Sequence, residues 1–247
     1  NSTDIDPLNN ETARSQLSTV ASQIGSPILV GGVTWGGTPY GPRNEGVMWP
    51  VKGPVTQRYA KQHLVPFGEY LPLRSPLTKL ISRFNQISTD FIPGDRPGIF
   101  HAGTHLFGDL ICFEIAYDNH VSTLIKRGAS FITLQTNNAT YRGRGQADQQ
   151  FTIARFRAIE HNRDVAVAST TGFSGFIDST GNVKQKSQEN KSMIMTDTVK
   201  MNAYQTFVDR HTHVADRVIL LLLGLSIFAD VRRRRRARRI THSLFSK

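Results

Sequence analysis

Alternating strand and helix patterns in the second half of this 247-residue chain constrain its fold more than any other feature. Runs rich in apolar and β-branched residues are separated by stretches with helical spacing of their apolar side chains. Strands that alternate with helices indicate an α/β protein, and a hairpin within the series predicts a mixed sheet. The strand patterns cover 106–112, 130–136 and 165–169, the helix patterns 115–125 and 146–161, and the hairpin joins 173–178 to a strand from Val183 through the turn at 179–182.

The first half of the chain has a less regular pattern. A helix is predicted over 11–24, because its apolar residues have helical spacing and Gly25-Ser26-Pro27 ends it. The stretch from Tyr59 to Leu73 has no clean period but is too apolar to be disordered, so we expect an ordered functional loop. The remaining predictions are strands over 28–35 and 47–51, a loop over 36–46, a short helix over 76–84 and a turn-rich connection over 94–103.

Charge is concentrated near the C-terminus. Seven arginines lie among the eight positions 232–239, and without them the net charge of +11 falls to +4. No aromatic residues are interleaved with these arginines, as stacking on bases requires, so we expect no nucleic-acid partner. The single cysteine excludes an internal disulfide framework and a cysteine-based zinc site.

An uncharged apolar run, 218–229, comes shortly before the arginines. It is apolar all round, and with flanking residues it predicts a transmembrane helix over 211–231 followed by a basic tail over 232–247. The positive-inside rule then places the tail in the cytoplasm and the preceding domain outside it. A buried core helix with a solvated basic tail is the alternative interpretation.

Two stretches carry residues that could form a nucleophilic site. Cys112 stands where a strand turns into a helix, and the positive end of a helix favours a thiolate. A buried structural cysteine is the alternative. Lys61 lies in the irregular stretch; lysines are usually solvated surface charges, but apolar neighbours make that interpretation weaker here. His63, two residues later, also permits a cysteine–histidine pair.

These two stretches carry a family resemblance that extends over nearly the whole chain. The run Lys61-Gln62-His63-Leu64-Val65-Pro66-Phe67-Gly68-Glu69-Tyr70 and the run Ile111-Cys112-Phe113-Glu114 resemble the nitrilase-type (carbon–nitrogen hydrolase) domain of bacterial apolipoprotein N-acyltransferases. The resemblance implies an α-β-β-α sandwich over 1–210, lacking its first strand, before the membrane helix. It also implies a bacterial cytoplasmic membrane location with the catalytic domain extracytoplasmic.

The resemblance also implies roles for four residues. Cys112 would be the nucleophile that becomes an S-acyl thioester, and Lys61 the triad lysine that stabilises the oxyanion. Glu69 and Glu114 would be supporting acids, and His63 a loop residue instead of a base. No metal and no organic cofactor are implied.

The third member of the family's Glu-Lys-Cys triad is not found in this sequence. In the family a glutamate closes a Trp-Pro-Glu motif, which these 247 residues do not contain. The register places it just before Asn1, and Glu11, at a helix start, is not assigned the role. We therefore expect an N-terminally truncated chain that is inactive alone. The loop Thr140-Tyr141-Arg142-Gly143 also departs from the family pattern, which affects expected lipid contacts.

The implied activity is acyl transfer between two lipids. A fatty acyl chain would move from a membrane phospholipid to Cys112, and then to the α-amine of a diacylglyceryl-cysteine lipoprotein. The apolar residues of the Lys61 loop (Leu64, Val65, Phe67, Tyr70 and Leu71) would either form a lipid-facing lip or pack beneath the loop. A nitrilase- or amidase-type hydrolase and a non-catalytic membrane-tethered remnant are the alternatives.

Overall fold

The structure, a computed structural model, describes residues 5–75, 89–141, 144–189, 191–211 and 214–244. The chain divides into two compact units, Asn1–Asp209 and Arg210–Lys247. This division lies one residue from the predicted domain end. The helix predicted over 76–84 falls outside the described residues.

The smaller sheet of the first unit is an antiparallel meander. Its order is β1 (Ile28–Gly36), β2 (Gly41–Trp49), β3 (Gln57–Ala60), and β1 pairs with β2 along its whole length. The loop predicted over 36–46 is therefore wrong, since most of it is strand. Its polar and glycine-rich residues give no local strand signal, and the hairpin pairing with β1 decides their conformation instead.

The larger sheet is mixed, as predicted. Its order is β4-β5-β6-β7-β8-β9; the central strands β5, β6 and β7 are parallel, and the outer pairs are antiparallel. β4 was not predicted, because it lies within a turn-rich stretch and its register comes from β5. The bounds are β4 Ile99–Ala102, β5 His105–Ile111, β6 Ile132–Thr136, β7 Val165–Ser169, β8 Gly175–Ile177 and β9 Val183–Lys186.

Two helices of the first unit, α1 and α4, have their predicted bounds. α1 (Glu11–Ile24) begins after Asn10, whose side chain accepts a hydrogen bond from the Ala13 amide, and ends at Gly25 in the left-handed conformation. α4 (Gln146–His161) has the predicted bounds. The others are α3 (Asp118–Lys126), α5 (Phe207–Arg210) and the 3₁₀ segments η2 (Cys112–Ala116) and η3 (Ala139–Tyr141).

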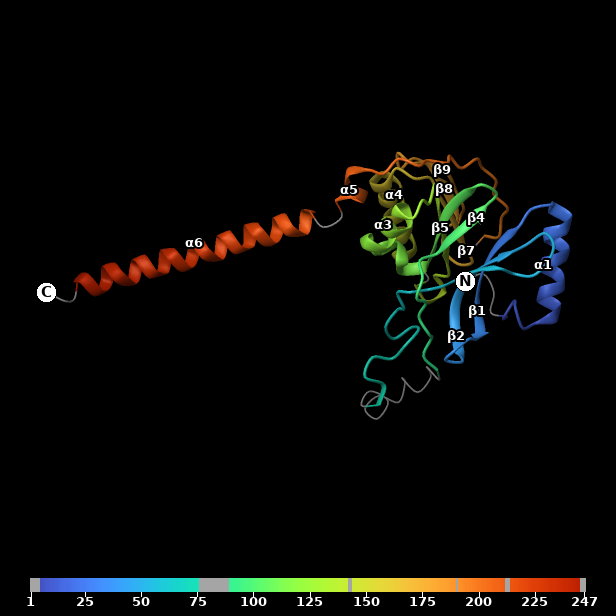
Figure 1. Cartoon of the computed structure of the whole chain (residues 1–247), viewed down its shortest axis with the longest axis horizontal. Helices are drawn as coiled ribbons and strands as arrows, with labels where there is room; N and C mark the ends of the chain where they lie inside the picture. The colour runs from blue at the N-terminus through green and yellow to red at the C-terminus, as the bar shows by residue number, and fades with distance from the viewer. Residues whose placement is uncertain (1–4, 76–88, 142–143, 190, 212–213, 245–247) are drawn as a thin grey trace. The chain divides into compact units, whose positions relative to one another are not determined.

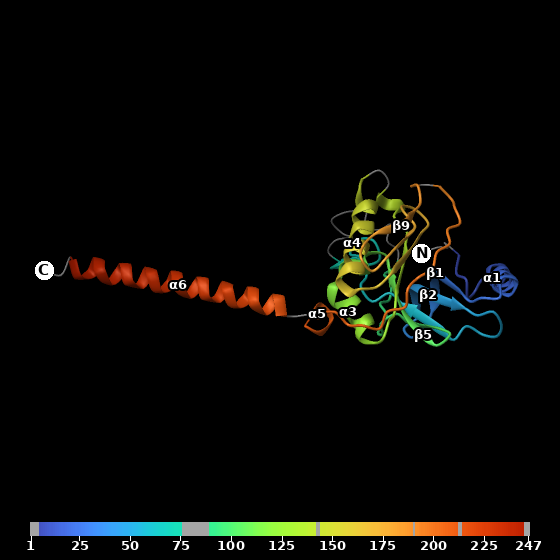
Figure 2. The same cartoon turned by 90° about the horizontal axis from the view of Figure 1, so that it is seen from above.

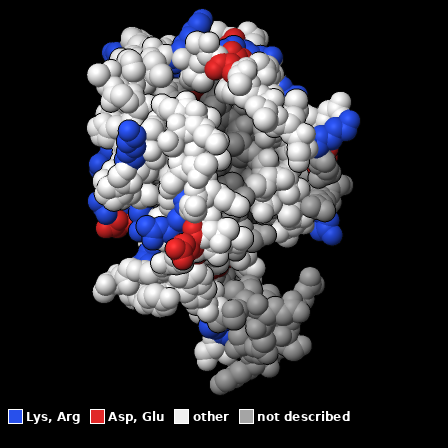
Figure 3. Space-filling model, turned by 90° about the vertical axis from the view of Figure 1, so that its right-hand side faces the viewer, with Lys and Arg blue, Asp and Glu red and all other residues white. Residues whose placement is uncertain are grey.

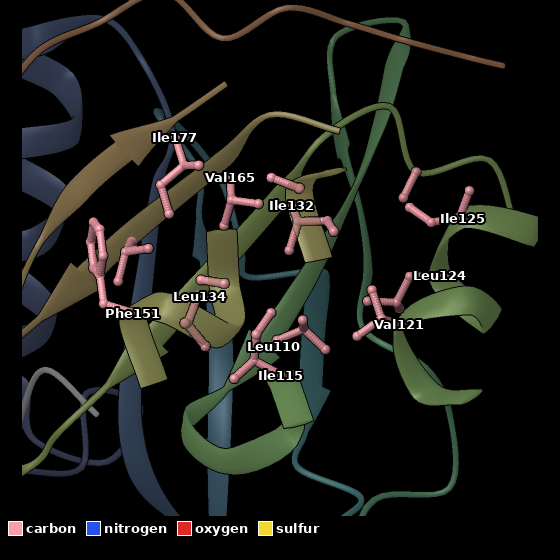
Figure 4. Packing of buried hydrophobic residues seen from close by; sticks show 14 residues of the cluster. Leu110, Ile115, Val121, Leu124, Ile125, Ile132, Leu134, Phe151, Val165 and Ile177 are labelled. Carbon is pink, nitrogen blue, oxygen red and sulfur yellow. The ribbon is translucent and has the colours of Figure 1, made fainter. Parts of the chain in front are cut away.

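Four layers make up the first unit, with a hydrophobic core at each of the three interfaces. Figure 2 shows α1, the small sheet, the large sheet and the pair α3 and α4 in that order, and Figure 1 shows the same elements from the side. Figure 4 shows the largest core, in which Leu110, Leu134 and Phe151 lie between the large sheet and its helices. Met48 and Phe107 belong to the core between the sheets, and Ala21, Val30 and Trp49 to the core beneath α1. The α-β-β-α sandwich is therefore present.

One face of the molecule is hollowed, and its charges are scattered. Figure 3 shows a recess with uncharged walls, and the Lys and Arg side chains of this face lie away from it. A cavity of about 390 Å³ lies between Leu29 of β1 and strands β6 to β8.

α6 (Val214–Leu244) forms most of the second unit and is one continuous helix. The arginine run, predicted to begin a separate tail at 232, is therefore helical. No helix in the described part of the chain is both long and apolar enough to cross a membrane. The transmembrane helix predicted over 211–231 is not supported by this finding.

Asp109 of β5 is a buried carboxyl group between the two sheets. Its Oδ1 accepts from Thr133 Oγ1 at 2.7 Å and its Oδ2 from Gln135 Nε2 at 2.6 Å. Burial raises the pKa of Asp109 to about 7, although these two hydrogen bonds oppose the rise. At Gly46 of β2, opposite Asp109, an added Cβ would lie 2.3 Å from Asp109 Oδ2, so only glycine fits there.

Asp109 is expected to make the domain less stable as the pH rises. Its pKa in the folded state lies above the ordinary value near 3.9, so the protonated form favours folding. This stabilisation is complete below about pH 4 and falls as the pH rises through about 7, by roughly 4 kcal/mol in total. Urea unfolding at pH 5 and pH 8 should show a smaller pH dependence for Asp109→Asn than for the unchanged chain. Equal pH dependence in both proteins would contradict this prediction.

Candidate active site

Cys112 begins a strained turn directly after β5. Its φ is +57°, a left-handed conformation that is unusual for a non-glycine residue. The Glu114 side chain holds this turn, because its Oε2 accepts from the Ile111 amide at 2.9 Å. The sequence predicted that an α-helix follows Cys112 directly, and this is wrong. The chain first passes through the five-residue η2, and α3 begins at Asp118. The Cys112 side chain is partly exposed, which excludes a fully buried structural thiol.

Lys61 is buried, with an exposed fraction of 1%, although lysines usually lie on the surface. It follows β3 directly, and its Nζ donates to both carboxylate oxygens of Glu69, at 2.9 and 2.8 Å. Glu69 also accepts from Asn44 Nδ2 at 2.6 Å and from the Val65 amide at 2.8 Å. The ammonium group is therefore held in one position by a carboxylate that is itself fixed.

Glu114 connects the lysine loop to the cysteine turn. Its Oε1 accepts from the Gln62 amide at 2.8 Å and from the His63 amide at 3.1 Å. Gln62 is the next residue after Lys61, and Glu114 stands two residues after Cys112. The structure thus brings the segments of all four predicted site residues together. Glu69 accepts hydrogen bonds from Lys61, and Glu114 accepts one from the next residue, Gln62, so the two hydrogen-bonded groups are adjacent along the chain.

An aromatic and imidazole cluster packs beside Glu114. The Tyr59 hydroxyl donates to Glu114 Oε1 at 2.8 Å, so its oxygen is free to accept from His120 Nε2 at 3.1 Å. Burial raises the pKa of Tyr59 well above its usual range, and burial lowers the pKa of His120. The His63 ring stacks on Tyr117, with ring centroids 4.2 Å apart. His63 therefore contributes packing to the loop.

A largely apolar cavity of about 250 Å³ opens beside Cys112. Amide side chains occupy one part of its wall, and the buried Oε1 of Gln146 has no hydrogen-bond partner among the residues that the structure describes. A partly exposed thiol next to apolar walls is suited to a substrate with a hydrocarbon portion. The apolar lining residues are Val65, Pro66, Phe113, Ile115, Tyr117 and Ile153.

Exposed aromatic residues lie along the same segments. Phe113, which follows Cys112, is 50% exposed, and Phe67 is 53% exposed. Leu71, which the sequence placed either in a lip or beneath the loop, is buried. The packing interpretation therefore applies to Leu71, whereas Phe67 faces solvent. Phe113 was not predicted to have this role, although its position between the cysteine and an acid is visible in the sequence.

The fold and the site define a class of protein. Residues 6–207 match the carbon–nitrogen hydrolase family model, and the chain belongs to that family. Among curated relatives, the apolipoprotein N-acyltransferase of Mycolicibacterium smegmatis is 35% identical over 234 residues, which cover 90% of this chain and 39% of the relative. That of Pasteurella multocida is 33% identical over 73% of this chain and 35% of the relative. The chain thus spans less than half the length of either relative.

Solved structures share the fold. Nit3 of Saccharomyces cerevisiae, described as a member of branch 10 of the nitrilase superfamily, has a TM-score of 0.57 at 17% identity, covering 77% of this chain and 66% of Nit3. An amidase from Nesterenkonia has a TM-score of 0.54 at 19% identity, covering 75% of this chain and 66% of the amidase. At these identities the likeness establishes the nitrilase-type architecture alone.

Proposed function

We propose that this chain is the catalytic part of an apolipoprotein N-acyltransferase. The observation that carries the proposal is the apolar cavity at Cys112, with the buried Lys61 segment tied to the same turn through Glu114. The identity to relatives of that name supports it over most of the chain. A cysteine, a fixed ammonium group and apolar walls together suit acyl transfer through a thioester.

The proposed reaction has two steps. The Cys112 thiolate attacks the ester carbonyl of a phospholipid; a C–S bond forms, the C–O bond breaks, and the lysophospholipid leaves as an alcohol with the proton taken from the thiol. The free amine of a diacylglyceryl-cysteine lipoprotein then attacks the thioester. A C–N bond forms, the C–S bond breaks, and the amine proton returns to the sulfur. Lys61 stabilises the oxyanion that develops in each step.

The general base of the first step comes, in this proposal, from outside these 247 residues. The two carboxylates of the site are already engaged: Glu69 with Lys61, and Glu114 with four donors. The family resemblance supplies a glutamate that would precede Asn1. The 247-residue chain is therefore expected to transfer no acyl group by itself, whereas a version extended to include that glutamate should be active.

A membrane location is part of the proposal. Large apolar side chains along α6, from Val218 to Phe228, are exposed, and the arginine run follows them. Such a helix is suited to the bacterial cytoplasmic membrane, where both lipid substrates reside. The arginines would lie on the cytoplasmic side and the catalytic domain on the extracytoplasmic side.

An amidase-type hydrolase is the second candidate, because the shared fold includes a solved amidase. The two activities are separated by supplying the extended protein with a phospholipid carrying a labelled acyl chain plus a diacylglyceryl-cysteine peptide, or with a small amide. Label on the peptide amine supports acyl transfer. Ammonia release from the amide without peptide labelling would favour the hydrolase, and neither product would favour a non-catalytic remnant.

Lys61→Met should slow acyl transfer by about 10²- to 10³-fold, because methionine fills the space but gives no charge to the oxyanion. The rate of peptide labelling measures this effect. Lys52→Met is the matched control, since Lys52 is exposed and lies in the loop between β2 and β3. A Lys61→Met protein as fast as the control would remove Lys61 from the proposed mechanism.

A further inference from the structure

Gln150 is a buried polar residue that points its amide at the Cys112 sulfur. It lies on α4 with an exposed fraction of 8%, and its Nε2 is 3.7 Å from Cys112 Sγ. Its Oε1 accepts from Thr136 Oγ1 and from Asn138 Nδ2, both at 2.9 Å. Three elements thus converge on this amide: α4, the end of β6 and the segment that follows β6.

The two donors at Oε1 decide which end of the amide faces the sulfur. With its oxygen held by Thr136 and Asn138, the amide can present only its N–H groups to Cys112. A thiolate is an acceptor without a proton, so an N–H donor stabilises it and a carbonyl oxygen would repel it. We propose that Gln150 is the hydrogen-bond donor that stabilises and orients the Cys112 thiolate, and that Thr136 and Asn138 are positioning residues for Gln150.

This assignment adds a source of thiolate stabilisation that the cysteine turn itself does not supply. η2 is only five residues long and 3₁₀, so it provides little of the dipole that a long α-helix would offer. The Gln150 donor reaches the sulfur from a different element instead. β5 and β6 are adjacent parallel strands, and their carboxyl ends place Cys112 and Thr136 at the same edge of the sheet. The mechanistic meaning rests on the proposed function, but the hydrogen bond itself does not.

The experiment measures thiol titration and needs no acyl transfer. Cys112 is the only cysteine of the chain, so the rate of iodoacetamide alkylation at each pH reports this thiol alone. Gln150→Met keeps the length of the side chain and removes the donor. We expect its alkylation profile to shift upward by about one pH unit, which lowers the thiolate fraction at neutral pH about tenfold. The ionisable groups Lys61, Glu69, Glu114 and His120 are the same in every variant.

Gln16→Met is the matched control, because Gln16 is an exposed residue of the same type on α1, which packs on the small sheet and does not line the cavity at Cys112. Its alkylation profile should equal that of the unchanged chain. A Gln150→Met profile that also equals it would overturn the proposal. If Gln150→Met fails to fold, as judged by circular dichroism, Thr136→Val decides the question: it should shift the profile in the same direction by less, and no shift would overturn the proposal.

The two proposals can fail independently. An upward shift in Gln150→Met together with no acyl transfer by the extended protein would leave Gln150 as the sulfur's donor and reject the acyltransferase. Acyl transfer together with an unshifted profile would keep the acyltransferase and reject the donor.

Discussion

Replacing Cys112 by alanine is expected to abolish formation of the acyl-enzyme. The side chain supplies the only sulfur at the apolar cavity, and no other described residue of that cavity carries a thiol. Loss of a nucleophile of this kind typically costs about 10⁴-fold or more in rate. The measurement is covalent labelling of the extended protein by a phospholipid with a labelled acyl chain, followed by release of the label with hydroxylamine, which cleaves thioesters.

A second substitution at the same position controls for effects on folding. Cys112→Ser keeps nearly the same volume and a polar atom at the turn, and it should unfold at about the same urea concentration as the unchanged chain while forming no hydroxylamine-sensitive adduct. Labelling that persists in Cys112→Ala would show that the acyl group is carried elsewhere. The nucleophile assignment would then have to be abandoned.

Replacing Glu114 by alanine is expected to cause the largest loss of stability of any single substitution at the site. The change leaves four donors without their acceptor: the Tyr59 hydroxyl and the amides of Gln62, His63 and Ile111. Buried donors without partners cost about 1–3 kcal/mol each, but partial relaxation makes roughly 3–5 kcal/mol the expected total. Urea unfolding of the 247-residue chain measures this loss.

Glu189→Ala is the matched control for that experiment, because Glu189 is exposed and its removal should change the free energy of unfolding by less than about 0.5 kcal/mol. In the extended protein Glu114→Ala should also lose acyl transfer, since the lysine loop is no longer tied to the cysteine turn. A stability within 1 kcal/mol of the control would mean that the four donors find other acceptors. The carboxylate would then not be what joins the two segments.

Local signals in the sequence were sufficient for much of the fold. α4 has the predicted bounds because its apolar residues follow helical spacing and Gly145 and Asn162, at its two ends, adopt left-handed conformations. β7 and the β8–β9 hairpin were likewise predicted from β-branched runs and a turn. The first part of β2 and all of β4 were missed because their strand character comes from pairing partners, which composition does not reveal.

The site was predictable only in part. The motifs singled out Lys61, Glu69, Cys112 and Glu114, and the structure brings their segments together. The sequence could not show that one carboxylate of the pair Glu69 and Glu114 fixes the lysine while the other fixes the loop, because both lie near the reactive residues in the chain. The contact of Gln150 with the sulfur depends on the packing of α4 against η2, which no spacing within α4 encodes.

The carboxylate of Glu114 has a consequence for the order in which the protein folds. It joins residues that are more than 50 positions apart, one segment continuing from β3 of the small sheet and the other from β5 of the large sheet. Contacts of such sequence separation form late, because closing the long loops between them costs conformational entropy. Neither sheet alone holds both segments. The reactive arrangement therefore comes into existence only when the two sheets have packed together, and a partly folded chain would contain the thiol without the lysine loop beside it.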